Sequence, residues 1–268
     1  MKQAQWLSPV GVAILVAIGC GGGKPQDASA TTKAGSTEAP IQLAQAPADA
    51  QPAGGAGSAS VQGTVRFDGT APSPEAVQMA ADPVCQQQHT SPVYSEEVVV
   101  NEPGTLKHVF VYVKEGITGS FPTPTTPVVL DQRGCWYTPH VFGIQVNQPL
   151  EIVNSDPTLH NVNAKPGQNR PFNIAQPVKG MKSTKTFTAP EVMVKCACNV
   201  HPWMATYIGV LEHPFFGVTG DDGRVTIAGL PAGQYTLEAW HEKYGTRTQT
   251  VSVGDGEATS VDFTFQAK

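Results

Sequence analysis

Short runs of alternating apolar and polar residues, separated by turn signals, constrain the fold of this chain more than any other feature. The first run, residues 61–67, leads into Asp68-Gly69, which predicts a strand followed by a turn. Similar runs occur at 108–113, 128–130, 143–146, 150–153, 191–196, 207–211, 224–227, 234–240, 248–253 and 261–265. Only residues 74–81 suggest helix, as one or two turns, so we predict an all-β fold of the sandwich or barrel type.

The composition agrees with a turn-rich β protein. Glycine and proline supply 27 and 23 of the 268 residues, whereas only 15% of residues are charged. This mixture disfavours a helical bundle or a coiled coil and indicates β structure, a disordered stretch, or both in series. The net charge of −5 leaves no basic field for a phosphate backbone, so we expect no nucleic-acid partner.

The first 20 residues have the pattern of an export signal. Lys2 precedes an apolar run at 10–18, which is too short to span a bilayer and ends in Ala17-Ile18-Gly19-Cys20. This segment resembles a bacterial lipoprotein signal, in which Cys20 becomes the lipidated first residue. An ordinary secretory signal is the alternative. In both cases we expect an exported protein of the cell envelope, and lipidation would anchor it to a membrane facing the periplasm or the cell surface.

Residues 21–60 have the composition of a disordered tether. Ala, Gly, Pro, Ser, Thr and Gln make up 33 of these 40 residues, and none is aromatic. Such a stretch buries too little apolar surface to offset its ordering entropy. We divide the remaining chain into an N-terminal β segment at 61–127, a domain at 128–212 and a domain at 213–268.

The last domain carries a recognisable pair of turns. Residues 218–227 read VTGDDGRVTI and residues 229–235 read GLPAGQY. This pattern resembles the carboxypeptidase regulatory-like, transthyretin-type β-sandwich. Such domains open with a strand like VxGxVxxxG, and residues 61–69 read VQGTVRFDG. The resemblance favours a sandwich that is split by an insertion, completed by 61–69 and about 108–115, over two domains in series.

A cluster of metal-ligating residue types lies between two of the predicted strands. Cys198, His201 and Met204 form a Cys-x₂-His-x₂-Met run, and His160 follows an earlier strand. Two imidazoles, one thiolate and a weak thioether are the ligands of a blue-copper site. Structural zinc is the competitor, but zinc rarely takes a thioether and prefers several Cys or His ligands.

Residues 128–212 therefore resemble a cupredoxin, a Greek-key β-sandwich, with the short ligand loop of the amicyanin type. The resemblance implies copper as cofactor, with His160, Cys198, His201 and Met204 as its ligands. It also implies that the edge of His201 reaches the surface through an apolar patch near Pro202 and Trp203. As a whole, the chain is similar to bacterial lipoproteins that combine a cupredoxin-like segment with a carboxypeptidase regulatory-like one.

A second cysteine in the loop leaves the nuclearity of the site open. Cys196 precedes Cys198 by two residues, so both side chains point to the same side of an extended strand. Cys196 is a free thiol, the ligand in place of Cys198, or a second thiolate that bridges two coppers. Purple dinuclear centres use Cys-x₃-Cys-x₃-His-x₂-Met, and the shorter spacing here argues against the bridge.

The two remaining cysteines, Cys85 and Cys135, lie near predicted turns. In an exported protein a disulfide between them is the simplest prediction, and it would close a loop of about 50 residues. The alternative is a second metal site made of Cys85 with His89 and Cys135 with His140. Two further histidines, His213 and His241, we interpret as structural or surface residues near the domain junction.

These observations favour a membrane-tethered copper protein that carries single electrons between a donor and an acceptor redox protein. We predict no enzyme activity, because the sequence has no phosphate-binding glycine loop, GxSxG elbow or HExxH motif. Two alternatives stay open. One is a copper storage or delivery lipoprotein without electron transfer, and the other is a surface adhesion β-sandwich in which the metal is incidental.

Overall fold

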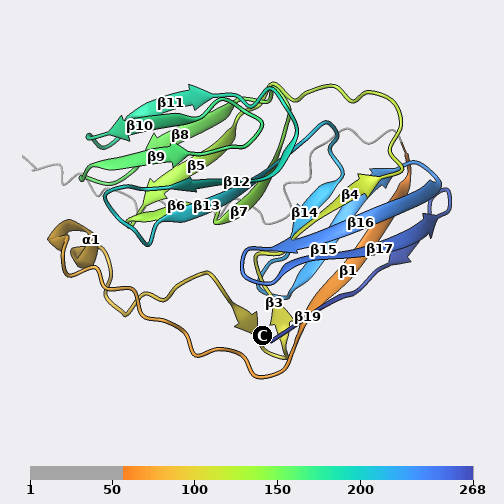
Figure 1. Ribbon diagram of the computed structural model, residues 1–268, viewed down its shortest axis with the longest axis horizontal. Helices are drawn as coiled ribbons and strands as arrows, with labels where there is room; N and C mark the ends of the chain where they lie inside the picture. The colour runs from red at the N-terminus through yellow and green to blue at the C-terminus, as the bar shows by residue number, and fades with distance from the viewer. Residues whose placement is uncertain (1–56, 268) are drawn as a thin grey trace, which may run out of the picture. The chain divides into compact units, whose positions relative to one another are not determined.

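The computed structural model describes residues 57–267, so the predicted signal, most of the tether and Cys20 lie outside the described residues. Within this range the chain is built from 19 strands and one short helix, which confirms the predicted all-β fold class (Figure 1). All described residues belong to one compact unit. Its strands form two pairs of sheets. Among the described residues no helix has the length and apolar character needed to cross a bilayer.

The first pair of sheets combines strands from both ends of the described chain. One sheet has the order β15-β1-β3-β2, with β18 and β19 also paired to β1 in parallel, and the other has the order β14-β4-β16-β17. Residues 59–68 and 110–115 therefore contribute to sheets whose other long strands lie within 216–266. The bounds are β1 Ala59–Asp68, β2 Val100–Asn101, β3 Thr105–Leu106, β4 Phe110–Glu115, β14 Phe216–Val218, β15 Arg224–Leu230, β16 Gly233–His241, β17 Gly245–Val253, β18 Ala258–Ser260 and β19 Phe263–Gln266.

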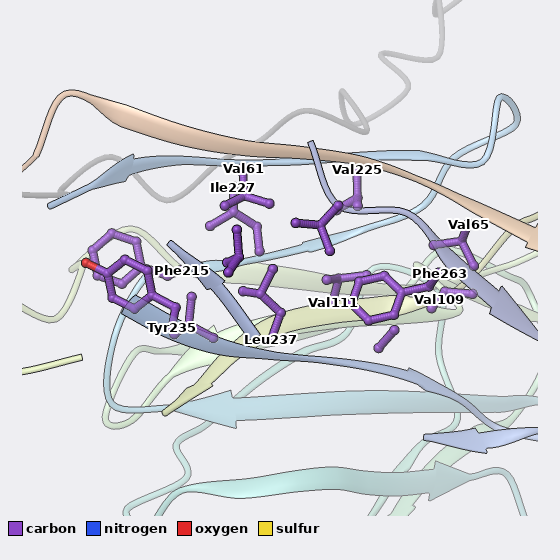
Figure 2. Packing of buried hydrophobic residues seen from close by; sticks show 14 of the residues in the cluster. Val61, Val65, Val109, Val111, Phe215, Val225, Ile227, Tyr235, Leu237 and Phe263 are labelled. Carbon is purple, nitrogen blue, oxygen red and sulfur yellow. The ribbon is translucent and has the colours of Figure 1, made fainter. Parts of the chain in front are cut away.

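Alternating side chains fill the space between these two sheets. In β1, Val61, Val65 and Phe67 are buried, whereas the intervening Gln62 and Arg66 are exposed. This is the period of two expected for a strand with one covered face. Figure 2 shows the resulting core, to which the two sheets contribute facing apolar residues: Val61, Val65, Val109, Val111, Phe215, Val225, Ile227, Tyr235, Leu237 and Phe263.

The second pair of sheets holds the predicted ligand loop. One sheet has the order β10-β9-β12-β13-β7 and the other the order β11-β8-β5-β6. Apolar residues of both sheets, including Ile152 and Ile208, share one buried cluster. The bounds are β5 Val128–Arg133, β6 Trp136–Thr138, β7 Val141–Gln145, β8 Leu150–Asn154, β9 His160–Ala164, β10 Phe172–Gln176, β11 Lys182–Lys185, β12 Glu191–Ala197 and β13 Ala205–Leu211.

Two glycines make room for aromatic rings where the two pairs of sheets meet. Gly143 of β7 lies opposite Gly209 of the parallel neighbour β13. A Cβ at Gly209 would lie 2.4 Å from the ring of Phe110, and a Cβ at Gly143 would lie 2.2 Å from the ring of Phe216. Since real Cβ atoms do not approach this closely, both positions require glycine. The two rings stack 5.6 Å apart in a small apolar cluster.

The single helix does not lie where the sequence suggested one. The turns predicted over 74–81 are not helical, and α1 spans Pro83–Gln87 instead. Asp82 is its N-cap and accepts hydrogen bonds from the backbone N–H groups of Val84 and Cys85. Pro83 fits the first helical turn because its missing N–H group would have no intrahelical partner there. Cys85 is the only residue that α1 buries.

Candidate metal centre

The predicted ligand loop is a tight connection between β12 and β13. Ala197 pairs with Ala205, and the seven residues between them are closed by two backbone hydrogen bonds. The N–H of Cys198 donates to the carbonyl of Met204 at 3.1 Å, and the N–H of Met204 donates to the carbonyl of His201 at 3.0 Å. This closure holds all three side chains on one short loop.

His160 reaches the loop because its strand lies beside β12. It is the first residue of β9, whose Asn163 pairs with Ala197. The next residue, Asn161, fastens β9 to the loop, since its Oδ1 accepts the N–H of Asn199 at 2.8 Å and lies 3.4 Å from the Cys198 sulfur. The structure therefore brings together residues that are 41 positions apart in the chain.

Three donor atoms converge at this point. Nδ1 of His201 lies 3.0 Å from Nδ1 of His160 and 3.7 Å from Sγ of Cys198, and all three atoms lie within 4.8 Å of one another. Ligands about 2.0 Å (nitrogen) and 2.3 Å (sulfur) from one tetrahedral ion are about 3.3–3.5 Å apart. The three residues therefore fit a single metal ion after small shifts. Their exposed fractions are 0% for His160, 4% for Cys198 and 1% for His201.

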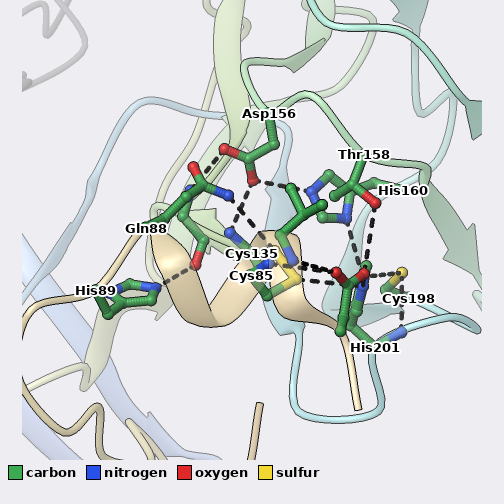
Figure 3. The surroundings of a disulfide bond; sticks show 12 residues. Cys85, Gln88, His89, Cys135, Asp156, Thr158, His160, Cys198 and His201 are labelled. Atoms are coloured by element: carbon green, nitrogen blue, oxygen red, sulfur yellow. Dashed lines mark hydrogen bonds and ion pairs between the residues drawn. A yellow bond between two sulfur atoms is a disulfide. The ribbon is translucent and has the colours of Figure 1, made fainter. Parts of the chain in front are cut away.

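Two carboxylates determine which imidazole nitrogens face the thiolate. Oδ2 of Asp156 lies 2.9 Å from Nε2 of His160 (Figure 3), and Oδ2 of Asp82 lies 2.9 Å from Nε2 of His201. A carboxylate on one nitrogen fixes the tautomer and leaves the other nitrogen as the metal ligand. Nδ1 of His160 and Nδ1 of His201 are therefore the ring nitrogens available to bind a metal. The sequence motifs include neither aspartate, although the Asp82-Pro83 helix start and the Asp156/His160 spacing of four residues are visible in the sequence.

The charges around the thiol favour its ionised form. Burial raises the pKa of Cys198, but hydrogen bonds with His160 and His201 outweigh burial and lower that pKa to about 5. Burial lowers the pKa of His160, whereas its bonds to Asp156 and Cys198 raise that pKa to about 9. At neutral pH the site therefore offers a thiolate, which is the form that binds soft metals, beside a protonated His160 that must give up its Nδ1 proton when a metal binds.

Met204 and Cys196 differ in their relation to this group. Met204 is fully buried in the same apolar cluster as Cys198. Cys196 is also fully buried, and burial raises the pKa of its thiol to about 12. Among the described residues, Cys196 belongs to no group of three converging donors. This geometry favours the interpretation of Cys196 as a protonated free thiol over the ligand and bridge alternatives.

Cys85 and Cys135 form a disulfide, with a Cα–Cα distance of 5.5 Å. The alternative second metal site, which needs their thiolates, is therefore wrong. His89 lies 2.7 Å from the carbonyl of Gly134, and His140 lies 2.5 Å from a Glu242 oxygen. Cys135 also joins two further groups of converging donors among the described residues, but a disulfide sulfur supplies no thiolate to either of them.

The expectation that the edge of the His201 ring reaches the surface is also wrong. The ring is 1% exposed, because Asp82 covers Nε2 and the disulfide sulfur of Cys85 lies 3.4 Å from the same nitrogen. Trp203 is half-buried beside the ring, with centroids 5.2 Å apart. The covering residues lie more than 100 positions upstream of His201, so the loop motif alone gives no sign of them.

The two histidines interpreted as structural lie away from this centre. Nε2 of His213 lies 2.9 Å from the carbonyl of Val113. His241 is 1% exposed in the other pair of sheets and accepts the N–H of Lys243. Burial lowers the pKa of His241 to about 4, so its ring is neutral at physiological pH.

Comparison with known proteins gives one family match and several similar structures. Residues 214–266, which are 53 of the 268, match the family model of the carboxypeptidase regulatory-like domain. No curated protein matches the chain. A copper-containing nitrite reductase from Thermus scotoductus SA-01 is 26% identical over 36% of this chain, with a TM-score of 0.31, and the match spans only 25% of the reductase.

Two smaller copper proteins are also similar. A variant of amicyanin in the Cu(I) form is 21% identical over 31% of this chain and 81% of its own, with a TM-score of 0.28. A purple cupredoxin from Nitrosopumilus maritimus is 19% identical over 31% of this chain and 97% of its own, with a TM-score of 0.27.

Proposed function

We propose that this chain is a mononuclear copper protein that carries single electrons between redox partners. The observation that supports it is the buried group of His160, Cys198 and His201, whose donor atoms lie close enough together to bind one ion after small shifts. We assign Met204, buried at the end of the same loop, as the weak fourth ligand. Bound copper would supply a one-electron couple at this position.

The donor set favours copper over zinc. A structural zinc site takes four Cys or His ligands, and among the described residues the group here has only three, His160, Cys198 and His201. One thiolate with two imidazoles suits both oxidation states of copper, because sulfur stabilises Cu(I) and nitrogen suits Cu(II). The rigid loop closure and the two carboxylates hold the donors in place, so little rearrangement is expected between the two states.

The burial of the donors supports electron transfer over substrate chemistry. A catalytic metal site keeps an open position for substrate, whereas the two histidines and the thiolate are at most 4% exposed. Electrons cross a few ångströms of packed protein without any opening. We therefore propose that the chain transforms no substrate and acts with a donor and an acceptor protein.

The proposed location follows from the N-terminal sequence. Lipidation at Cys20 would anchor the chain to a membrane, with the residues between Cys20 and β1 as the proposed tether. The predicted tether ends at residue 60, whereas β1 already begins at Ala59. The protein would then work in the cell envelope. Detergent-phase partitioning of the expressed protein, compared with Cys20→Ala, tests this part separately.

Mediated electrochemistry of the copper-loaded protein tests electron transfer. We expect one reversible one-electron wave, with rapid exchange between the oxidised and reduced protein. A wave that is irreversible, or that appears only at very slow scan rates, would contradict the proposal.

One observation favours copper storage or delivery as a second candidate. Both imidazoles are closed off, since carboxylates cover Nε2 of His160 and of His201. A closed site holds its ion strongly whether or not electrons pass. Stoichiometric copper binding without a reversible couple would select this second function.

A further inference from the structure

We propose that residues 82–88 form a lid locked by the Cys85–Cys135 disulfide, and that Asp82 is the residue that positions His201 and closes the metal centre to the outside. The lid comprises α1 and its two flanking residues. This inference rests on the proposed metal site and adds a route of entry and release, which nothing in the ligand loop itself specifies.

Asp82 is shared between the lid and the centre. Its Oδ1 accepts the backbone N–H of Val84 at 2.9 Å and of Cys85 at 3.3 Å, as the N-cap of α1. Its Oδ2 lies 2.9 Å from Nε2 of His201 and accepts the hydroxyl of Thr158 at 3.4 Å. The direction of the carboxylate is thus set by α1, and the carboxylate in turn orients the imidazole.

The disulfide fastens the lid to the part of the fold that holds the other imidazole. Cys135 follows Gly134 in the turn between β5 and β6, and the N–H groups of both residues donate to Asp156 at 2.8 Å. The same carboxylate binds His160 at 2.9 Å. The disulfide therefore joins the lid, which supplies the carboxylate for His201, to the turn whose N–H groups hold Asp156, the carboxylate for His160 (Figure 3).

Little else attaches the lid itself. Cys85 is the only residue of α1 that is buried, and Gln86, Gln87 and Gln88 are exposed. A contact of 3.8 Å between Gln88 and the sulfur of Cys135 accompanies the disulfide. The attachment of the lid is thus concentrated in Cys85 and Asp82, and both contact Nε2 of His201.

This arrangement has a kinetic consequence. While the lid is closed, His201 is 1% exposed and Cys198 is 4% exposed, so an ion has no open path to the donors. Entry and release then require the lid to lift, and the disulfide opposes that motion. We expect loss of the disulfide or of Asp82 to speed metal exchange without changing the number of ions bound.

The first test measures copper release from the loaded chain to an excess of a strong chelator. Cys85→Ser/Cys135→Ser and Asp82→Ala should each release copper at least tenfold faster than the wild type. Asp82→Asn keeps one acceptor, which can cap α1, but turns its NH₂ group toward Nε2 of His201, so it should also release copper faster than the wild type, though less than Asp82→Ala. Gln87→Ala, which alters an exposed lid residue, is the matched control and should release at the wild-type rate. Equal rates in all variants would overturn the proposal.

The second test uses no metal, so its failure is distinct from failure of the copper assignment. The apoprotein is treated with iodoacetamide, and labelling is followed at Cys196 and Cys198 separately by peptide mass spectrometry. An open lid should speed labelling of Cys198, whose Sγ lies 3.7 Å from Nδ1 of His201, about tenfold. It should leave labelling of Cys196 unchanged, since among the described residues Cys196 joins no donor group with His201 and is 0% exposed. If labelling of both cysteines becomes faster in the double serine variant, that variant is unfolding, and the labelling rate of Cys198 in Asp82→Ala is then the decisive measurement. An unchanged rate of Cys198 labelling in Asp82→Ala would overturn the lid proposal.

Discussion

Replacing Asp156 by asparagine is expected to destabilise the apoprotein far more than its small chemical change suggests. The side chain is fully buried, and its two oxygens accept the N–H groups of Gly134 and Cys135 and bind Nε2 of His160. Burial raises the pKa of Asp156, but these bonds outweigh burial and hold that pKa below its usual value. The carboxylate is therefore ionised at neutral pH.

An asparagine has only one acceptor oxygen, so its NH₂ group must face at least one of these donors. Removing one member of a buried, hydrogen-bonded ion pair costs about 3–5 kcal/mol, and each unsatisfied buried donor costs about 1–3 kcal/mol. Since these contributions overlap, we expect Asp156→Asn to lower the free energy of unfolding by about 3 kcal/mol.

Urea denaturation of the apoprotein at pH 7, followed by fluorescence, gives this free energy directly. Asp131→Asn is the matched control, because Asp131 is partly exposed and contacts Arg133 and Ser155 at the surface. We expect a loss of less than 1 kcal/mol there. If Asp156→Asn also loses less than 1 kcal/mol, the reasoning about a shared buried carboxylate is refuted.

Two further predictions concern the packing and the pH response of the fold. Gly209→Ala should cost about 1–3 kcal/mol in thermal or urea unfolding, because the new Cβ meets the ring of Phe110. Gly167→Ala, whose Cβ finds ordinary contacts, should change stability little, and equal losses would contradict the close approach. Since the folded pKa of His241 is about 4 and its ordinary value is 6.5, only the unfolded chain gains this proton between these pH values. The contribution of His241 to stability should therefore fall by roughly 2 kcal/mol between pH 7 and pH 5, and the lowered pKa of Cys198, about 5, adds a further loss over the same range. His241→Phe should flatten this pH slope, and an unchanged slope would exclude His241 as its source.

The strands with alternating or continuous apolar residues could be predicted from the sequence, whereas the polar strands could not. β1 buries one face and shows the expected alternation, and β16 keeps the apolar alternation of Tyr235, Leu237 and Ala239 although Glu238 is also buried. β9 (HNVNA), β10 (FNIAQ) and β11 (KSTK) carry polar residues that hydrogen-bond within the sheet or face outward, so their strand pairing has no local apolar signal. The helix was predicted at the wrong residues, because its position depends on the N-cap at Asp82.

The ligand loop could be predicted because its chemistry is local, with Cys198, His201 and Met204 within seven residues. His160 was predicted because a blue-copper site needs a second imidazole ligand. Asp156 lies only four positions before His160, whereas Asp82 could not be predicted from spacing, because it lies 119 positions from His201 and reaches it only through the fold. For the same reason the resemblance gave a wrong expectation for the edge of His201.

A copper titration, followed by visible absorption and a metal count, shows most directly whether each chain binds a single copper through one thiolate. We expect one copper per chain and an intense thiolate-to-copper band that Cys198→Ala abolishes and Cys196→Ala retains. Two coppers per chain, a colourless complex, or a band that survives Cys198→Ala would contradict this expectation.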